Sequence, residues 1–193
     1  SLRAMFSDYR VQALYAFNFN IGVGFGSVMT FIAIFMTDSL LASATVVGLV
    51  IGSRPVVSAI GQPIFGRLAD RVSRHQMMVV GGLLLATGTF VIPFASTVGI
   101  LLVMFLGLGI AESMVIPSSL AVTADLGRRY GHGTMMGFSN AILVFGLLCG
   151  SVGASFVESG LGINNAFRAA AILMAVMVVL FSARWAQSEK SAG

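Results

Sequence analysis

Long apolar stretches separated by short polar ones dominate the pattern of this chain. A helix needs about 20 apolar residues to cross a membrane core roughly 30 Å thick, and the chain contains several stretches of that length. No strand-length alternation is visible, and unpaired backbone groups are too costly in lipid for an open sheet. The pattern therefore predicts six transmembrane helices, approximately at residues 11–36, 44–65, 77–96, 98–121, 134–156 and 166–185.

These segments occupy most of the chain, so we expect a single six-helix transmembrane domain over residues 1–193. The composition agrees, because 57% of the residues are hydrophobic and only 9% are charged, whereas a soluble domain has about 25% charged residues. The sequence thus predicts an all-α membrane protein that contacts the lipid bilayer and has hardly any mass outside it.

Positive charge gathers on one side of the predicted bundle. With six spans, the Lys and Arg residues near both chain ends and after the second and fourth segments fall on one side, and Arg168 alone lies near the other. This is the positive-inside distribution. We therefore expect a cell (inner or plasma) membrane location with both termini cytoplasmic, and no nucleic-acid partner.

One polar turn, residues 66–75, places three arginines, an aspartate and a histidine between the second and third segments. Asp70 can put a carboxylate near the positive N-terminal end of a neighbouring helix, and we expect this to be the fifth, near Gly133. Arg71 and Arg74 can pair with acidic groups or lipid phosphates at the same level.

The same turn resembles the signature loop of the major facilitator superfamily of secondary transporters, Gly-x-Leu-Ala-Asp-Arg-x-Gly-Arg-Arg/Lys between the second and third helices. The matching residues are Gly66, Leu68, Ala69, Asp70, Arg71 and Arg74. Ser73 and His75 depart from the motif. The resemblance implies one six-helix half of that fold, with 3+3 inverted repeats. It also implies a latch at this turn that holds one transport state, and a topology anchor is the alternative.

The resemblance further implies the C-terminal half. Unlike the family's N-terminal half, the fourth segment has no arginine and the fifth has no proline, and the polar tail after Trp185 resembles a chain end. The family's binding cavity lies between two halves. We therefore expect a partner, which is either the other six-helix half or a second copy of the chain.

Two charged residues lie well inside apolar segments, Arg54 in the second and Glu112 in the fourth. At about 1.5 Å per residue they lie about 18 and 20 Å from the arginine-rich side, near the midplane where transporter sites tend to lie. Such groups cost several kcal/mol unless they are paired or hydrated. We expect Glu112 to bind a coupling proton and Arg54 to tune its charge. A fixed structural ion pair is the alternative.

Polar groups in the first segment are candidates for contact with a substrate. Tyr15 and Asn18 are three residues apart and can share one helix face, although Asn18 can equally bond a neighbouring helix. We expect Asn140 to make a bond between helices. Glycines four residues apart, at Gly146/Gly150 and Gly48/Gly52, indicate close helix packing.

Together these features predict transport of a small solute by alternating access, with proton coupling as one possibility. A non-transporting six-helix assembly or channel subunit is the alternative, and it does not account for the arginine-rich turn. With only two histidines, both near the membrane edge, we expect no enzyme activity, and the sequence suggests no metal or cofactor site.

Overall fold

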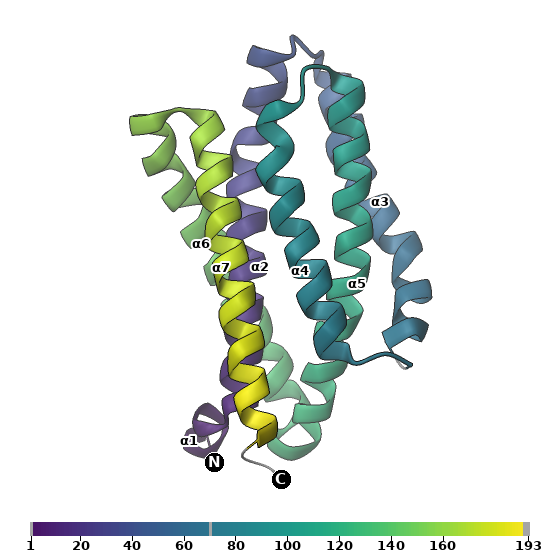
Figure 1. Cartoon of the computed structure of the whole chain (residues 1–193), viewed down its shortest axis with the longest axis vertical. Coiled ribbons are helices and arrows are strands. Elements are labelled where there is room, and N and C mark those ends of the chain that lie inside the picture. The colour runs from purple at the N-terminus through teal and green to yellow at the C-terminus, as the bar shows by residue number, and fades with distance from the viewer. Residues whose placement is uncertain (1, 70, 191–193) are drawn as a thin grey trace.

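The computed structural model describes residues 2–69 and 71–190, with side chains for 4–69 and 71–185. It consists of helices joined by short turns (Figure 1). In chain order the elements are α1 (Leu2–Ser7), α2 (Tyr9–Ile34), the π-helix η1 (Phe35–Ser39), α3 (Ala44–Ala69), α4 (Arg74–Val91), the 3-10 helix η2 (Ile92–Phe94), α5 (Val98–Tyr130), α6 (His132–Leu161) and α7 (Ile163–Lys190). In the described part of the chain, six helices are long and apolar enough to span a membrane. The predicted all-α membrane fold is confirmed.

The helices extend beyond the apolar stretches that predicted them. The fourth segment was expected to end at residue 121, yet α5 continues to Tyr130. It ends where Gly131 adopts a φ of 98° and its N–H donates to the Gly127 carbonyl at 2.8 Å. Hydropathy marks only the part of a helix that lies in lipid, whereas the helix itself ends where its backbone is capped.

Both ends of the chain lie at the same end of the bundle (Figure 1). We call it the arginine-rich end, because α3 and α5 finish there with Arg67, Arg128 and Arg129 in their last turns. We call the other the opposite end. It holds the turns that follow η1, η2 and α6.

The six long helices form two related sets of three, α2–α4 and α5–α7, and the main packing contacts join one set to the other. Helix α2 packs mainly on α6 and also on α7, while α5 packs mainly on α3 and also on α4, and α4 contacts α7. Exchanging α2, α3 and α4 for α5, α6 and α7 reproduces these pairings. Helix α2 starts at the arginine-rich end and α5 at the opposite end (Figure 1), so the two repeats are inverted.

The contact between α2 and α6 is a direct backbone contact made through glycines. A Cβ atom at Gly22 or Gly26 would overlap the backbone of α6, and one at Gly146 or Gly150 would overlap the backbone of α2. Because the two helices lie so close, the Ser27 hydroxyl of α2 can donate to the Gly150 carbonyl of α6 at 3.1 Å. In lipid, such packing and hydrogen bonds drive helix association, and the predicted role of Gly146 and Gly150 is confirmed.

The second glycine pair lies on an uncovered surface. A Cβ atom at Gly48 or Gly52 would meet no described atom within 4 Å, so the close contact expected there is not formed within the described residues. In the most apolar windows of α3 and α6 only 22% and 17% of the residues are buried, against 61% in α2. Helices α3 and α6 are thus the edges of the bundle, and their outer faces are left for lipid or a partner.

The glycine contact makes a testable prediction for stability. Replacing Gly146 by Ala places a Cβ atom against the Phe19 carbonyl of α2, and overpacking of this kind costs roughly 1–3 kcal/mol. We expect a lower midpoint of thermal unfolding in detergent micelles, measured by circular dichroism. Gly153→Ala on the same helix is the control, because its Cβ atom meets no described atom within 4 Å. Equal midpoints for the two variants would refute the contact.

Candidate functional site

A cavity of about 350 Å³ opens where α2, α5 and α6 meet. Its lining is mostly apolar, with five hydroxyl or amide side chains from Asn18, Ser119, Thr123, Ser139 and Asn140. Ser119 donates to the Asn18 amide oxygen at 2.8 Å and so joins α5 to α2 across the cavity. The Ser139 hydroxyl is buried and has no hydrogen-bond partner among the described atoms. An apolar pocket with few polar groups is typical of small-molecule sites.

Two polar residues differ from their expected places. Tyr15 is not among the residues that line this cavity, and its hydroxyl contacts the sulfur atoms of Met5 and Met135 at 3.8 and 3.5 Å. Tyr15 therefore lies one turn from Asn18, beside the cavity. Asn140 was expected to bond a neighbouring helix, but its exposed side chain lines the cavity instead.

The two intramembrane charges form a buried ion pair. Arg54 Nη2 lies 2.6 Å from Glu112 Oε1, and the two side chains are 6% and 13% exposed. The Arg54 guanidinium also lies over the Phe25 ring of α2, with 5.3 Å between Cζ and the ring centroid. Its Nε and Nη1 groups have no acceptor among the described atoms. Arg54 can therefore donate hydrogen bonds to a further oxygen atom while its Nη2 group stays paired with Glu112.

The ion pair and the cavity share helix α5, and the Phe25 ring that Arg54 contacts lies on the cavity helix α2. Phe25 follows Asn18 by seven residues on α2, and Glu112 precedes Ser119 by seven residues on the antiparallel α5. Seven residues are two helical turns, or about 10 Å, and positions so spaced share a helix face. The Arg54–Glu112 pair therefore lies about 10 Å from the Asn18–Ser119 bond, toward the opposite end.

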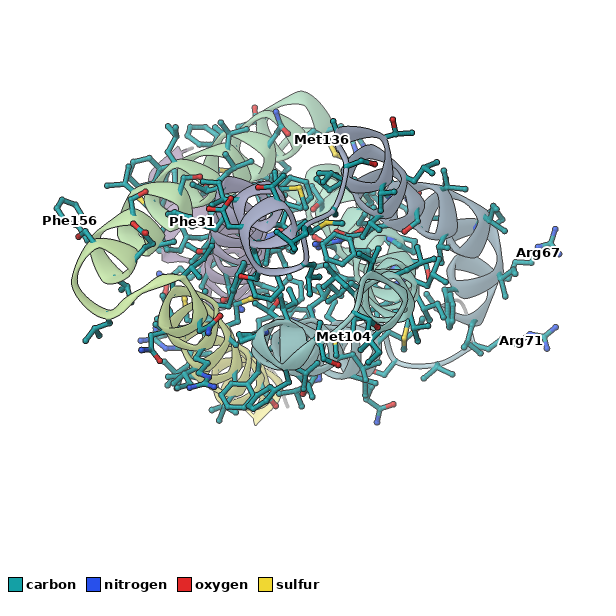
Figure 2. All side chains as sticks on the ribbon, turned by 90° about the horizontal axis from the view of Figure 1, so that it is seen from above. Phe31, Arg67, Arg71, Met104, Met136 and Phe156 are labelled. Carbon is teal, nitrogen blue, oxygen red and sulfur yellow. The ribbon has the colours of Figure 1, made fainter. Side chains whose placement is uncertain are left out.

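The signature turn joins helices at the arginine-rich end. Arg74 Nη1 forms an ion pair with Asp125 Oδ2 and reaches the Ala121 carbonyl at 3.5 Å, which connects the start of α4 to α5. Arg67 and Arg71 are exposed and point away from the bundle (Figure 2). Asp70 lies outside the described residues, so its expected contact with α6 stays a prediction.

A second polar contact at this end was not expected from the sequence. Asp8 caps α2 by accepting from the Arg10 backbone N–H at 2.9 Å. It also accepts from the Tyr130 hydroxyl at 2.9 Å and lies 3.7 Å from Arg129 Nη1. The carboxylate therefore joins the start of α2 to the end of α5.

Sequence reasoning also missed the hydroxyls of the cavity. Ser119 and Thr123 follow Glu112 by seven and eleven residues, a spacing that puts all three on one helix face. That periodicity could have singled them out. Hydroxyls in membrane helices often bond the carbonyl of the preceding turn instead, as Ser118 does to Met114 at 2.8 Å, so the residue type carries little signal.

The match to a known family covers nearly the whole chain. The family described as the Major Facilitator Superfamily matches residues 14–192. This chain belongs to the major facilitator superfamily. The six-helix bundle with its inverted repeat is accordingly one half of that fold, and the protein is a multi-pass membrane protein of a transporter family.

Several curated superfamily members are similar to this chain. Multidrug resistance protein 1 of Bacillus subtilis is 26% identical over 163 residues, which cover 84% of this chain and 42% of that protein. The multi-drug resistance efflux pump PmrA homolog of Lactococcus lactis is 28% identical over 165 residues, 84% of this chain and 40% of that protein. Quinolone resistance protein NorA of Staphylococcus aureus is 23% identical over 141 residues, 73% of this chain and 36% of that protein.

The chain spans less than half the length of each of these relatives. A superfamily half without its counterpart has one wall of the central cavity and not the other. That this is the C-terminal half stays a prediction.

Proposed function

We propose that this chain is one half of a non-enzymatic transporter that moves small amphiphilic solutes across the membrane by alternating access, driven by protons. The observation that carries the proposal is an apolar cavity with a few polar groups, two helical turns from a buried Arg54–Glu112 pair. The names of the similar superfamily members, which refer to multidrug and quinolone resistance, support a drug-like substrate.

The lining of the cavity supports this substrate class. None of the described residues that line it is charged, so it favours neutral or amphiphilic molecules held by apolar contact and oriented by hydroxyl and amide groups. A volume of about 350 Å³ lies at the low end of the range for drug-sized ligands. The other half of the transporter supplies the remaining wall.

The exposed apolar faces of α3 and α6 support a partner half. Both helices present rows of large apolar side chains, namely Leu49, Val56, Ile60 and Ile64 on α3 and Phe145, Leu148, Val152 and Phe156 on α6. Helix α6 lines the cavity itself, and α3 packs against the cavity helix α5. We assign the partner as the other six-helix half, and a second copy of the chain is the alternative.

The buried ion pair supplies a mechanism for proton coupling. Removing one partner of a buried pair typically costs about 3–5 kcal/mol, because the other charge is left unpaired. When Glu112 takes up a proton, its attraction to Arg54 weakens, and the unpaired donors of Arg54 favour another oxygen ligand. An oxygen atom of the substrate, or of the other half, can accept hydrogen bonds from these donors. Binding of that oxygen would then link protonation of Glu112 to a change of transport state.

Neutralising Glu112 tests the coupling. We expect Glu112→Gln in the full-length protein to lower pH-gradient-driven uptake of a fluorescent quinolone into everted vesicles by about tenfold or more, because the proton site is lost. Exchange of the drug at equal pH should persist, because the cavity is unchanged.

Glu158→Gln, near the end of α6, removes a carboxylate outside the site and is the matched control. Thermal midpoints of both variants separate a coupling defect from unfolding. If Glu112→Gln still concentrates the drug in response to a pH gradient, the coupling role is refuted while the cavity remains.

The Arg74–Asp125 pair supports the proposed latch at the signature turn. The two side chains are 32% and 56% exposed, and ion pairs at such positions are worth only about 0–1 kcal/mol. A contact of this strength holds one state and opens at little cost. Asp70 of the same turn is proposed to make the further latch contact that the motif resemblance implies. Arg71, which points away from the bundle, is proposed to pair with lipid phosphates at the same level.

A charge swap tests the latch. Arg74→Asp or Asp125→Arg alone places like charges together, so we expect each to slow drug transport severalfold. The double variant restores an opposite pair and should recover most of the rate in the same vesicle assay. Arg67→Asp is the control, because Arg67 points away from the bundle. Failure of the double variant to recover, with folding intact, would contradict a latch through this pair.

The arginine distribution supports an orientation with the arginine-rich end in the cytoplasm of the cell. In a background with Cys149 replaced by Ala, an impermeant maleimide should label Ser39→Cys in intact cells. It should label His132→Cys only after lysis. Both residues are exposed, at opposite ends of the bundle. The reverse pattern would overturn the orientation and leave the fold intact.

A further inference from the structure

Arg168 of α7 is the one Lys or Arg that the charge pattern of the sequence places near the opposite end. Its Cζ atom lies 5.1 Å from the centroid of the Phe94 ring. Its Nε group is buried without an acceptor, and no ion pair involves it within the described part of the chain. An arginine near the membrane surface can pair with the phosphate of an anionic lipid, so this position can take an anion from outside the chain.

A surface groove of about 190 Å³ lies between α4 and α7. The lining is apolar except for one hydroxyl and consists of Leu83, Ala86, Thr87, Phe90, Ala171, Ile172 and Ala175. The groove shares no lining residue with the cavity between α2, α5 and α6. It is therefore a separate feature of the bundle, on the face formed by α4 and α7 (Figure 1).

Helical register places Arg168 at the mouth of the groove nearest the opposite end. Arg168 precedes Ala171 and Ala175 by three and seven residues, so all three share one face of α7. Phe90, the lining residue of α4 nearest that end, lies beside Phe94 with 6.3 Å between the ring centroids. The Arg168 guanidinium, the two phenyl rings and the groove thus form one continuous surface.

We propose that this groove binds one acyl chain of an anionic phospholipid, phosphatidylglycerol, whose phosphate pairs with Arg168. The groove lies along membrane-spanning helices, where lipid chains are the surrounding solvent, and Arg168 supplies the charge that a phosphodiester complements. A guanidinium donates two parallel hydrogen bonds to phosphate oxygens, which satisfies the Nε group that lacks an acceptor. About seven residues of α7, roughly 10 Å of helix, would lie alongside the lipid acyl chain.

Photolabelling tests the lipid site directly. The purified full-length protein in maltoside micelles, which contain no phosphate, is exposed to phosphatidylglycerol carrying a diazirine within one acyl chain. Labelled peptides are then mapped by mass spectrometry. We expect labels within residues 83–90 and 171–175, about fivefold above those from a diacylglycerol with the same chains and no phosphate, as expected for one favourable arginine contact.

Variants separate the charge from the groove. Arg168→Gln should lower phosphatidylglycerol labelling to the diacylglycerol level, and Arg168→Lys should retain most of it. Arg184→Gln, an exposed arginine at the other end of α7, is the charge control. Thr87→Phe should fill the groove and lower labelling by both lipids. Leu84→Phe is its control, because Leu84 is exposed on the same helix and does not line the groove.

Several outcomes would overturn the assignment. Equal labelling by the two lipids, or full labelling of a folded Arg168→Gln variant, would show that no phosphate is recognised. Displacement of the label by millimolar inorganic phosphate would identify a free anion as the ligand. Cross-links between the groove peptides of two protein molecules would identify a second copy of the protein as the occupant. None of these outcomes bears on the transport cavity or on Glu112.

Discussion

Backbone contact between α2 and α6, made through glycines, sets the geometry of the bundle. Because Gly22 and Gly150 carry no Cβ atom, the two helices approach until the backbones touch. Helices α3 and α5 meet in the corresponding way, with Gly109 against the Arg54 carbonyl. Helix α2 is thus held by α6 and α5 by α3, whereas α2 and α5 touch each other only sparsely. The cavity lies where α2 and α5 meet α6.

The cost of charge in lipid shapes the interior of this half. The Arg54–Glu112 pair is nearly enclosed, and it also fastens α3 to α5 in the layer where these helices approach closely. An ion pair in which every N–H and carboxylate oxygen has a hydrogen-bond partner would serve only to hold the two helices together. Here two donor groups of Arg54 lack acceptors among the described atoms, and a half-satisfied buried network favours an additional ligand. The same group can therefore serve structure and coupling.

The two ends of the bundle are built from different interactions. At the arginine-rich end, the half-buried carboxylate of Asp8 meets Tyr130, and the exposed carboxylate of Asp125 meets Arg74. These contacts join helix ends across short distances and are weak enough to exchange. At the opposite end the helices close through tight turns, and the Arg168 guanidinium lies over the Phe94 ring. These different interactions are consistent with helices that move at the arginine-rich end and are held by lipid at the opposite end.

Hydropathy alone specified six helices, because lipid allows few alternatives to a helix. Counting residues put Arg54 and Glu112 at similar depths, and the turn around Arg71 indicated the family. Helix ends could not be predicted from hydropathy, since they depend on backbone caps such as Gly131. The pairing of Gly146 with α2 and the bond between Asn18 and Ser119 depend on how the helices rotate about their axes. Apolar residues on all sides of a helix leave that rotation unspecified. Only packing between helices resolves it, and so it was packing that brought Asn18 to Ser119.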